Sequence, residues 1–363
     1  MAKEIKSTPA SQSRSRNNNF AFVRFAAACS VFMGHMGITL GIDPPYIAGI
    51  TMHELGVMTL FLIGGYLITK SWLSDPHPIR YAIRRFFRLW PPFAVFVLII
   101  VFITGPLISS LGVRGYFEGP FTLYLKNLRF TPVFYQPGVF ENVPEACSTN
   151  GSLWTMPVEA AVYILTPLFL TLIRIKQTPK RSFRIIAALA GAAIAADIIL
   201  RVFFLHVKVV FYGTDIVSAH HIIVMYIIGI LFTYDEVKKL LNMQIACAAF
   251  CIMLLFQMTA DPLRHLALYI LFPYIIFSVV FAANPVFSKM DKKMDLSYGI
   301  YLYGFFFQQF VVSLLIQYQV DMSYSEVLAI CAVPTLIAAI LSYYLVERPM
   351  IRLGRNLVKK FKS

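Results

Sequence analysis

Ten apolar segments follow one another along the chain, and each is long enough, or nearly long enough, to cross a bilayer as a helix. They cover residues 20–38, 51–69, 89–109, 153–173, 185–204, 217–233, 243–260, 265–283, 296–317 and 327–346. Only 14% of the residues are charged, whereas a soluble domain carries about 25%. Backbone amides inside lipid need partners within their own segment, and helices provide them. The sequence therefore predicts an all-α, polytopic membrane protein with about ten transmembrane helices.

The basic residues predict how these helices are oriented. With the N-terminus in the cytoplasm, most of the 32 Lys and Arg residues lie in segments that face the cytoplasm, as the positive-inside rule requires. Both termini are then cytoplasmic. The predicted organisation is a basic N-terminal tail at 1–19, a transmembrane domain at 20–350 with one long outer loop at 110–152, and a basic C-terminal tail at 351–363.

Membrane orientation also explains the net charge of +14. No soluble basic face with interleaved aromatic side chains remains outside the spans, so we expect no nucleic-acid partner. The five cysteines are scattered and show no metal-ligand spacing, so we also expect no metal site. Membrane lipids are the partners that the composition itself implies.

Arg24 and His35 lie eleven residues apart in the first span. Eleven steps of about 100° return nearly to the starting direction, so both side chains share one helical stripe, roughly 16 Å apart along the axis. A cation and an imidazole at membrane depth are costly and therefore indicate a functional site. His35 could accept a proton from an alcohol, and Arg24 could bind phosphate or carboxylate oxygens. The alternatives are a histidine bonded between helices and an arginine that reaches the inner headgroups.

Arg85 and Arg88 precede a Trp-Pro-Pro sequence at the inner end of the third predicted span. They are three residues apart and share a helical face. Two guanidinium groups in this position could clamp the diphosphate of a nucleotide. The alternative is ordinary positive-inside flanking.

The fourth span opens with a second group of candidate residues. Glu159 lies near the estimated depth of His35, where a carboxylate could orient the imidazole. Ser152, seven residues earlier, is interpreted as the N-cap of this helix.

Other charged and titratable residues are interpreted as structural. Asp197 and Arg201 are four residues apart and are expected to form an ion pair. The pairs His53-Glu54 and His220-His221 are interpreted as structural or interfacial, because adjacent residues on a helix point in different directions and make a poor metal site.

Aromatic side chains supply the candidate substrate-binding residues. The outer loop 110–152 combines many aromatic residues, Tyr135 among them, with three glutamates. Such pairs can stack on sugar rings and accept their hydroxyl hydrogens. The alternative is a loop that packs its own aromatic residues at the interface. Trp154 and Tyr301, near the starts of the fourth and ninth spans, complete the candidate set.

Taken together, these residues resemble the membrane-bound acyltransferase family 3, the bacterial O-acyltransferases of surface glycans. The matching motifs occur in the family's order across roughly residues 20–350. They are Arg24 with His35, Arg85-Phe-Phe-Arg88-Leu-Trp-Pro, Ser152-Leu-Trp-Thr-Met-Pro-Val-Glu159, Leu296-Ser-Tyr-Gly-Ile-Tyr-Leu-Tyr303 and Tyr344-Leu-Val-Glu347-Arg-Pro349.

The chain departs from the family's pattern at two places. The acidic residue and the serine that members often carry in span two are missing from the segment 56–65. Gly304 stands where many members have a histidine. Both departures concern the class of acceptor rather than the histidine of the first span.

The resemblance implies a multi-pass enzyme of the bacterial inner membrane that moves an acyl group, most often acetyl, from acyl-coenzyme A to a hydroxyl. The acceptor would be a cell-envelope glycan or a lipid-linked sugar. Arg24, Arg85 and Arg88 would bind the donor's phosphates, and His35 would act as general base with Glu159 as its orienting group. A glycolipid or polysaccharide flippase or transporter, and a non-enzymatic sensor or scaffold, are the alternative functions.

Overall fold

The computed structural model describes residues 18–204, 207–282 and 294–361. Most of the predicted N-terminal tail (1–17) and the end of the predicted C-terminal tail (362–363) lie outside the described residues.

Eight helical runs among the described residues are long and apolar enough to cross a membrane. They are α1 (Phe20–Leu40), α2 (Met52–Ser74), α3 (Pro78–Ile99) continued to α4 (Gly105–Ile108), α6 (Met156–Leu172) with its preceding 3₁₀ turn Gly151–Thr155, α7 (Pro179–Phe203), α11 (Asp261–Val280), α12 (Ser297–Gln317), and α13 (Tyr324–Ser342) continued to α14 (Arg348–Lys360). Two shorter apolar helices are α8 (Ile216–Leu231) and α10 (Met243–Leu255).

Each of the ten predicted apolar segments coincides with one of these helices, and the helical membrane class is confirmed. Eight rather than ten are long enough to span by themselves. α8 and α10 are shorter, and α8 is surrounded by α2, α7 and α11, which cover its sides.

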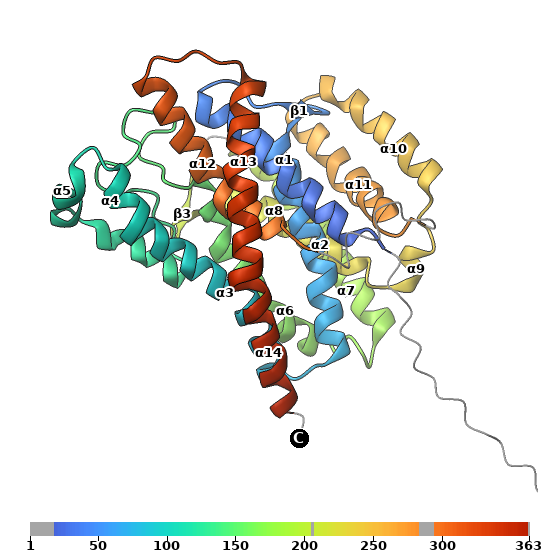
Figure 1. The fold of residues 1–363 in the computed structure, drawn as a ribbon. Helices are drawn as coiled ribbons and strands as arrows, with labels where there is room; N and C mark the ends of the chain where they lie inside the picture. The colour runs from blue at the N-terminus through green and yellow to red at the C-terminus, as the bar shows by residue number, and fades with distance from the viewer. Residues whose placement is uncertain (1–17, 205–206, 283–293, 362–363) are drawn as a thin grey trace, which may run out of the picture.

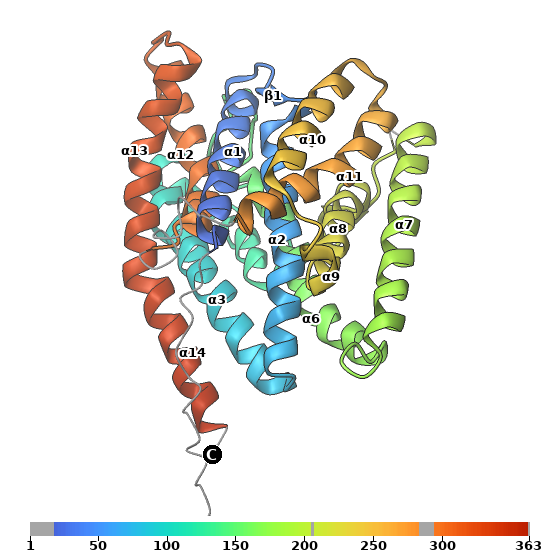
Figure 2. The ribbon, with the colours of Figure 1, turned by 90° about the vertical axis from the view of Figure 1, so that its right-hand side faces the viewer.

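The helices form one bundle around α1 and α2. Packing joins α1 to α2 and α12, and α2 to α8. Figure 1 and Figure 2 show α12 and α13 on one side of α1, with α10 and α11 on the other side. This arrangement places α1, which carries Arg24 and His35, in the interior of the bundle rather than at its edge.

Short elements connect the helices. β1 (Tyr46–Ile47) pairs with β2 (Ile50–Thr51) before α2, and β3 (Val210–Phe211) pairs with β4 (Thr214–Asp215) before α8. α9 (Asp235–Lys238) follows α8, while α5 (Gly112–Glu118) and a 3₁₀ helix (Phe121–Arg129) belong to the long loop 110–152. The loop packs its own aromatic rings, since Tyr116 and Tyr124 are fully buried.

The third span begins earlier than predicted. Its helix starts at Pro78, capped by His77, and runs through Pro91 and Pro92. These two prolines lack the amide hydrogens that would bond the carbonyls of Phe87 and Arg88. The helix nevertheless continues through both prolines, and Tyr298 donates to the neighbouring carbonyl of Leu89 at 2.9 Å. Arg85 and Arg88 therefore lie within this helix, before the predicted start of the span.

The last helix also continues beyond its predicted end. α13 passes through a π-helical turn, Tyr343–Glu347, directly into α14, so most of the predicted C-terminal tail is helical. α14 packs on α3 and extends past the rest of the bundle (Figure 2).

Two glycines set the contact between α2 and α8. A Cβ atom on Gly65 would lie 2.0 Å from the carbonyl oxygen of Tyr226. One on Gly229 would lie 2.0 Å from that of Leu62. Small residues let helix backbones approach closely in membranes, and here the approach leaves no room for a methyl group on either side.

Candidate active site

His35 is buried on α1, with 7% of its surface exposed. Its neighbour Gly34 allows α2 to approach, since a Cβ atom there would lie 2.3 Å from the backbone nitrogen of His53. The imidazole consequently stacks on the ring of His53 at 5.4 Å and meets Phe305 edge to face at 5.3 Å. Its Nδ1 lies 3.4 Å from the hydroxyl of Ser152.

His35 reaches a polar cavity of about 410 Å³. The cavity is lined by His35, His53, Glu54, Val57, Trp154, Asp197, Leu200, Arg201, Val217, Ser218, His221 and Ile222. A second hollow of about 530 Å³ lies at the α6–α7 turn, lined by Leu172, Ile173, Arg174, Arg181 and Ile185, and none of the candidate residues lines it. The polar cavity is therefore the place where a substrate could meet the His35 imidazole.

The predicted capping role of Ser152 is wrong. Asn150 caps the 3₁₀ turn instead, since its side-chain oxygen accepts from the Ser152 amide at 3.0 Å. Asn150 also donates to the carbonyl of Leu302 at 2.7 Å, which fixes the turn against α12. The Ser152 hydroxyl is thereby left facing His35. Asparagine is itself a favoured N-cap residue, so the sequence carried this signal two positions earlier.

The three candidate substrate-binding residues lie in three different places in the structure. Trp154 lines the polar cavity. Tyr301 is buried behind Ser152, where its hydroxyl donates to the Ser152 carbonyl at 2.9 Å and lies 2.6 Å from that of Thr155. Tyr135 belongs to the loop 110–152, is 38% exposed and does not line the cavity. Trp154 alone of these three is placed to touch a ligand near His35.

Glu159 is directed away from the predicted partner. It accepts a hydrogen bond from Tyr163 at 2.6 Å, and its charged neighbours are Arg88 and Arg85. No hydrogen bond among the described residues joins it to His35. Ser152 lies at the same depth as His35. Glu159 follows seven residues later, which places it about 10 Å from Ser152 along the helix axis and away from the imidazole.

Arg24 and Arg88 meet at a carboxylate. The Oδ2 atom of Asp295 lies 3.0 Å from Arg24 and 3.1 Å from Arg88. Burial favours the neutral form of Asp295, but the two guanidinium groups outweigh burial and hold its pKa well below its usual range. Asp295 was not among the predicted site residues, although a carboxylate next to span nine is a natural counter-ion for arginines at membrane depth.

Arg85 lies on the same face of α3. It donates to the Ser71 hydroxyl at 3.2 Å, and its guanidinium lies 5.8 Å from the ring of Tyr81 and 5.7 Å from that of Tyr163. The buried Nε atoms of Arg85 and Arg24 have no hydrogen-bond partner among the described residues. Both therefore retain a donor for a further oxygen.

Arg84, which directly precedes Arg85, is engaged elsewhere. It donates to Asp75 at 2.7 Å, together with Arg80. We refer to Arg24, Arg85, Arg88 and Asp295 as the arginine cluster.

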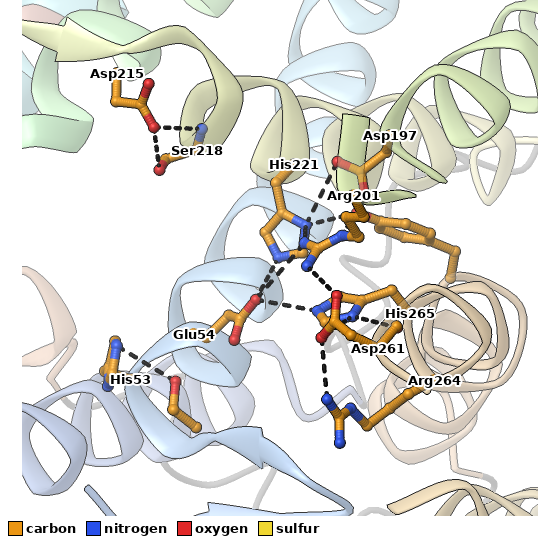
Figure 3. A network of polar contacts seen from close by, with 12 residues as sticks. His53, Glu54, Asp197, Arg201, Asp215, Ser218, His221, Asp261, Arg264 and His265 are labelled. Atoms are coloured by element: carbon orange, nitrogen blue, oxygen red, sulfur yellow. Dashed lines mark hydrogen bonds and ion pairs between the residues drawn. The ribbon is translucent and has the colours of Figure 1, made fainter. Parts of the chain in front are cut away.

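A second polar network forms the wall of the cavity (Figure 3). The predicted pair of Asp197 and Arg201 is confirmed, with a distance of 2.7 Å. Glu54 lies 2.8 Å from His221 Nε2 and 3.4 Å from His265 Nε2. His221 and His265 are both buried. Asp197 with Arg201, Glu54 and His221 were interpreted as separate local groups, and His265 was not singled out. Four helices bring all five together.

Among the described residues, Glu54, His221 and His265 form a group whose spacing could suit a metal ion, since their ligand atoms lie within 4.8 Å of one another. Arg201 argues against such a site. Its Nη2 lies 2.6 Å from His221 Nδ1. A guanidinium only donates, so Nδ1 must accept and the proton of this imidazole resides on Nε2. The nitrogen that would face the metal is therefore protonated.

Comparison with known proteins gives one consistent result. A family profile described as an acyltransferase domain matches residues 17–344. "Nodulation protein 10" of Rhizobium leguminosarum bv. viciae is 30% identical over 189 residues, which are 49% of this chain and 50% of that protein. The "O-acetyl transferase" of Shigella phage Sf6 is 23% identical over 92% of this chain and 96% of its own length. "O-acetyltransferase OatA" of Staphylococcus aureus strain NCTC 8325 is 24% identical over 83% of this chain and 53% of its own length.

The chain thus spans about half the length of the rhizobial and staphylococcal relatives. No solved structure matches it significantly.

Proposed function

The chain belongs to the acyltransferase 3 family that its motifs resembled, and on this premise we propose that it moves an acyl group, in the first place acetyl, from acyl-coenzyme A to a hydroxyl of a cell-envelope glycan or lipid-linked sugar. One observation carries the proposal. A single buried helix, α1, brings Arg24 to a cluster of arginines and His35 to a separate polar cavity. Donor and acceptor would therefore approach one helix at two different depths.

The arginine cluster is the proposed donor site. Arg24, Arg85 and Arg88 present guanidinium groups that suit phosphate oxygens. The unpartnered Nε atoms of Arg24 and Arg85 leave hydrogen-bond donors for such oxygens. The long pantetheine arm of the donor can bridge the roughly 16 Å between the depths of Arg24 and His35.

The proposed reaction uses His35 as general base. The imidazole removes the proton from the acceptor hydroxyl while the hydroxyl oxygen forms a bond to the acyl carbon and the thioester C–S bond breaks. The proton then passes to the departing thiolate, so charges and atoms balance. The Ser152 hydroxyl, 3.4 Å from Nδ1, takes the orienting role that the sequence assigned to Glu159. A covalent acyl-histidine is a second route through the same residue.

The proposal is tested on the products. Surface glycans from cells with and without the protein are compared by mass spectrometry, and the purified protein is supplied with labelled acetyl-coenzyme A. We expect glycans that are heavier by one acyl unit and thermal stabilisation of the protein by acetyl-coenzyme A. Unchanged glycans together with transport of a glycolipid across vesicles would show that the protein is a transporter instead.

The donor site predicts a selective effect of arginine substitutions. Arg85→Ala or Arg88→Ala should raise KM for acetyl-coenzyme A about 10- to 100-fold, because each removes a charge-assisted hydrogen bond worth roughly 1.5–3 kcal/mol. Arg84→Ala is the matched control, since Arg84 lies on the same helix but pairs with Asp75. Equal KM values in all three variants would contradict the donor site.

Substitution of Asp295 should change the affinity for acetyl-coenzyme A in the opposite direction. Asp295→Asn should tighten acetyl-coenzyme A binding by up to about tenfold, because it removes a carboxylate that competes with the phosphates for Arg24 and Arg88. The free protein should melt at a lower temperature, since two partly buried guanidinium groups lose their counter-ion. Both quantities are read from thermal melts with and without the donor. Weaker donor binding in this variant would show that Asp295 helps to hold the donor.

A further inference from the structure

The wall of the cavity that His35 reaches carries polar groups that the proposed donor site and base do not use. Glu54 comes from α2, Asp197 and Arg201 from α7, and His221 from α8 (Figure 3). Trp154 adds an aromatic ring to the same cavity. Since all of these share one space with His35, a ligand bound to them would lie beside the imidazole.

The charges of this wall are balanced. The Nδ1 atom of His265 lies 2.9 Å from the Asp261 carbonyl and 3.1 Å from its carboxylate, and Nε2 lies 3.4 Å from Glu54. Both nitrogens face only acceptors, so this ring carries both protons and a positive charge. Three cations, His265, Arg201 and Arg264, thus stand against three carboxylates, Glu54, Asp197 and Asp261. A neutral ligand suits this network better than an ion.

Two of the wall's imidazoles have unused nitrogens. His221 Nε2 is buried and, although 2.8 Å from Glu54, is not aligned for a hydrogen bond to any described residue. His53 Nδ1 is likewise buried without a partner. Both residues line the cavity. Buried polar atoms without partners are rare in native proteins and indicate a missing ligand or water.

The free atoms form a donor next to an acceptor. The contacts of Glu54 with Arg201, His221 and His265 use Oε1, which leaves Oε2 to accept from a ligand. His221 Nε2 carries the proton, because Nδ1 accepts from Arg201. A hydroxyl both donates and accepts, so one sugar hydroxyl would satisfy Glu54 and His221 together. A metal ion would satisfy only Glu54.

We propose that this wall is the acceptor subsite, which binds a neutral sugar residue: Glu54 and His221 hold one of its hydroxyls, its ring lies against Trp154, and another hydroxyl is presented to His35. This inference rests on the proposed function, and it adds the class of acceptor and the residues that select it. Glu54 and His221 are specificity-determining residues in this scheme and take no part in the proton transfer.

The test compares Glu54→Gln with wild type, using a panel of neutral methyl glycosides, their deoxy analogues and a methyl glucuronide as acceptors. For the glycoside that wild type acetylates fastest, Glu54→Gln should raise the acceptor KM about 10- to 100-fold, because a hydrogen bond to a charged group is lost. KM for acetyl-coenzyme A should stay within about twofold. For the deoxy analogue that lacks the bound hydroxyl, wild type and Glu54→Gln should have the same acceptor KM.

Arg264→Gln is the matched control. It removes a charge from the same ion network, but Arg264 pairs with Asp261 and does not line the cavity. Its acceptor KM should match wild type. If Arg264→Gln and Glu54→Gln raise the acceptor KM equally, the effect is structural and the subsite is refuted.

Binding is measured separately by ligand-observed NMR, so that the two proposals can fail independently. If wild type transfers no acyl group but still binds the neutral glycosides, and Glu54→Gln does not, the subsite stands and the proposed function falls. If wild type transfers acetyl and Glu54→Gln has an unchanged acceptor KM, the function stands and the subsite falls. Preference for the glucuronide, or thermal stabilisation of wild type but not of Glu54→Gln by Zn²⁺ alone, would also overturn the inference.

Discussion

His35→Ala should lower the rate of acyl transfer by about 10²–10⁴, the usual contribution of a general base. The imidazole is the group that reaches the polar cavity from α1, and its ring is held between His53 and Phe305. The proposed donor site, the arginine cluster, includes Arg24 of α1 but not His35, so acetyl-coenzyme A should stabilise the variant as well as it stabilises wild type. The rate is measured with the purified protein, and donor binding by thermal melting.

Two further variants test whether the expected loss of activity is due to the missing base. His35→Gln keeps a polar side chain of similar reach but cannot act as a base near neutral pH, and it should be as inactive as His35→Ala. Ser152→Ala removes only the contact to Nδ1 and should have the smaller effect. An acetyl group found on His35 by mass spectrometry, when acceptor is withheld, would establish the acyl-histidine route. Near wild-type transfer by His35→Ala would refute both routes.

Gly229→Val should prevent assembly of the native bundle. The new Cβ would stand 2.0 Å from the carbonyl oxygen of Leu62, and a backbone atom cannot move aside as a side chain can. Overpacking costs about 1–3 kcal/mol where the surroundings relax, and more is expected where two helices must separate. α2 and α8 carry Glu54 and His221, so the acceptor subsite would be lost with the contact.

Gly65→Val, on α2, should also prevent assembly of the native bundle, since its Cβ would stand 2.0 Å from the carbonyl oxygen of Tyr226 on α8. Gly191→Ala is the matched control, because it lies in a helix with no atom within 4 Å of the added Cβ. That variant should melt at or slightly above the wild-type temperature, as alanine favours helix over glycine. The measurements are the yield of monodisperse protein and the melting temperature. A normal melting temperature for Gly229→Val would contradict the close helix contact.

The sequence predicts which segments are helical, because hydropathy acts on each segment locally. It does not predict where α3 begins, because the first turns of that helix carry several arginines and do not continue the apolar pattern. Asp295 and the cavity wall were missed because the residues that meet there are distant from one another in sequence. The Glu54 and His265 side chains meet across 211 residues of chain, and apolar periodicity does not state which helices become neighbours.

In the candidate site, too, features within one helix could be predicted from the sequence, whereas contacts between helices could not. Arg24 and His35 could be paired from one helix, since their spacing alone fixes their relative direction. Glu159 was placed wrongly because its depth was counted from the membrane boundary, whereas the 3₁₀ turn that Asn150 caps sets the level at which α6 meets His35.

The continuity of α3 has a consequence for how tightly a donor can be held. Arg85 and Arg88 lie on one continuous helix, and α14 packs against it. Groups that are already in place lose little conformational freedom when a ligand arrives. A nucleotide would therefore meet a preorganised clamp, and more of its interaction energy would be expressed as affinity instead of being consumed in ordering the chain.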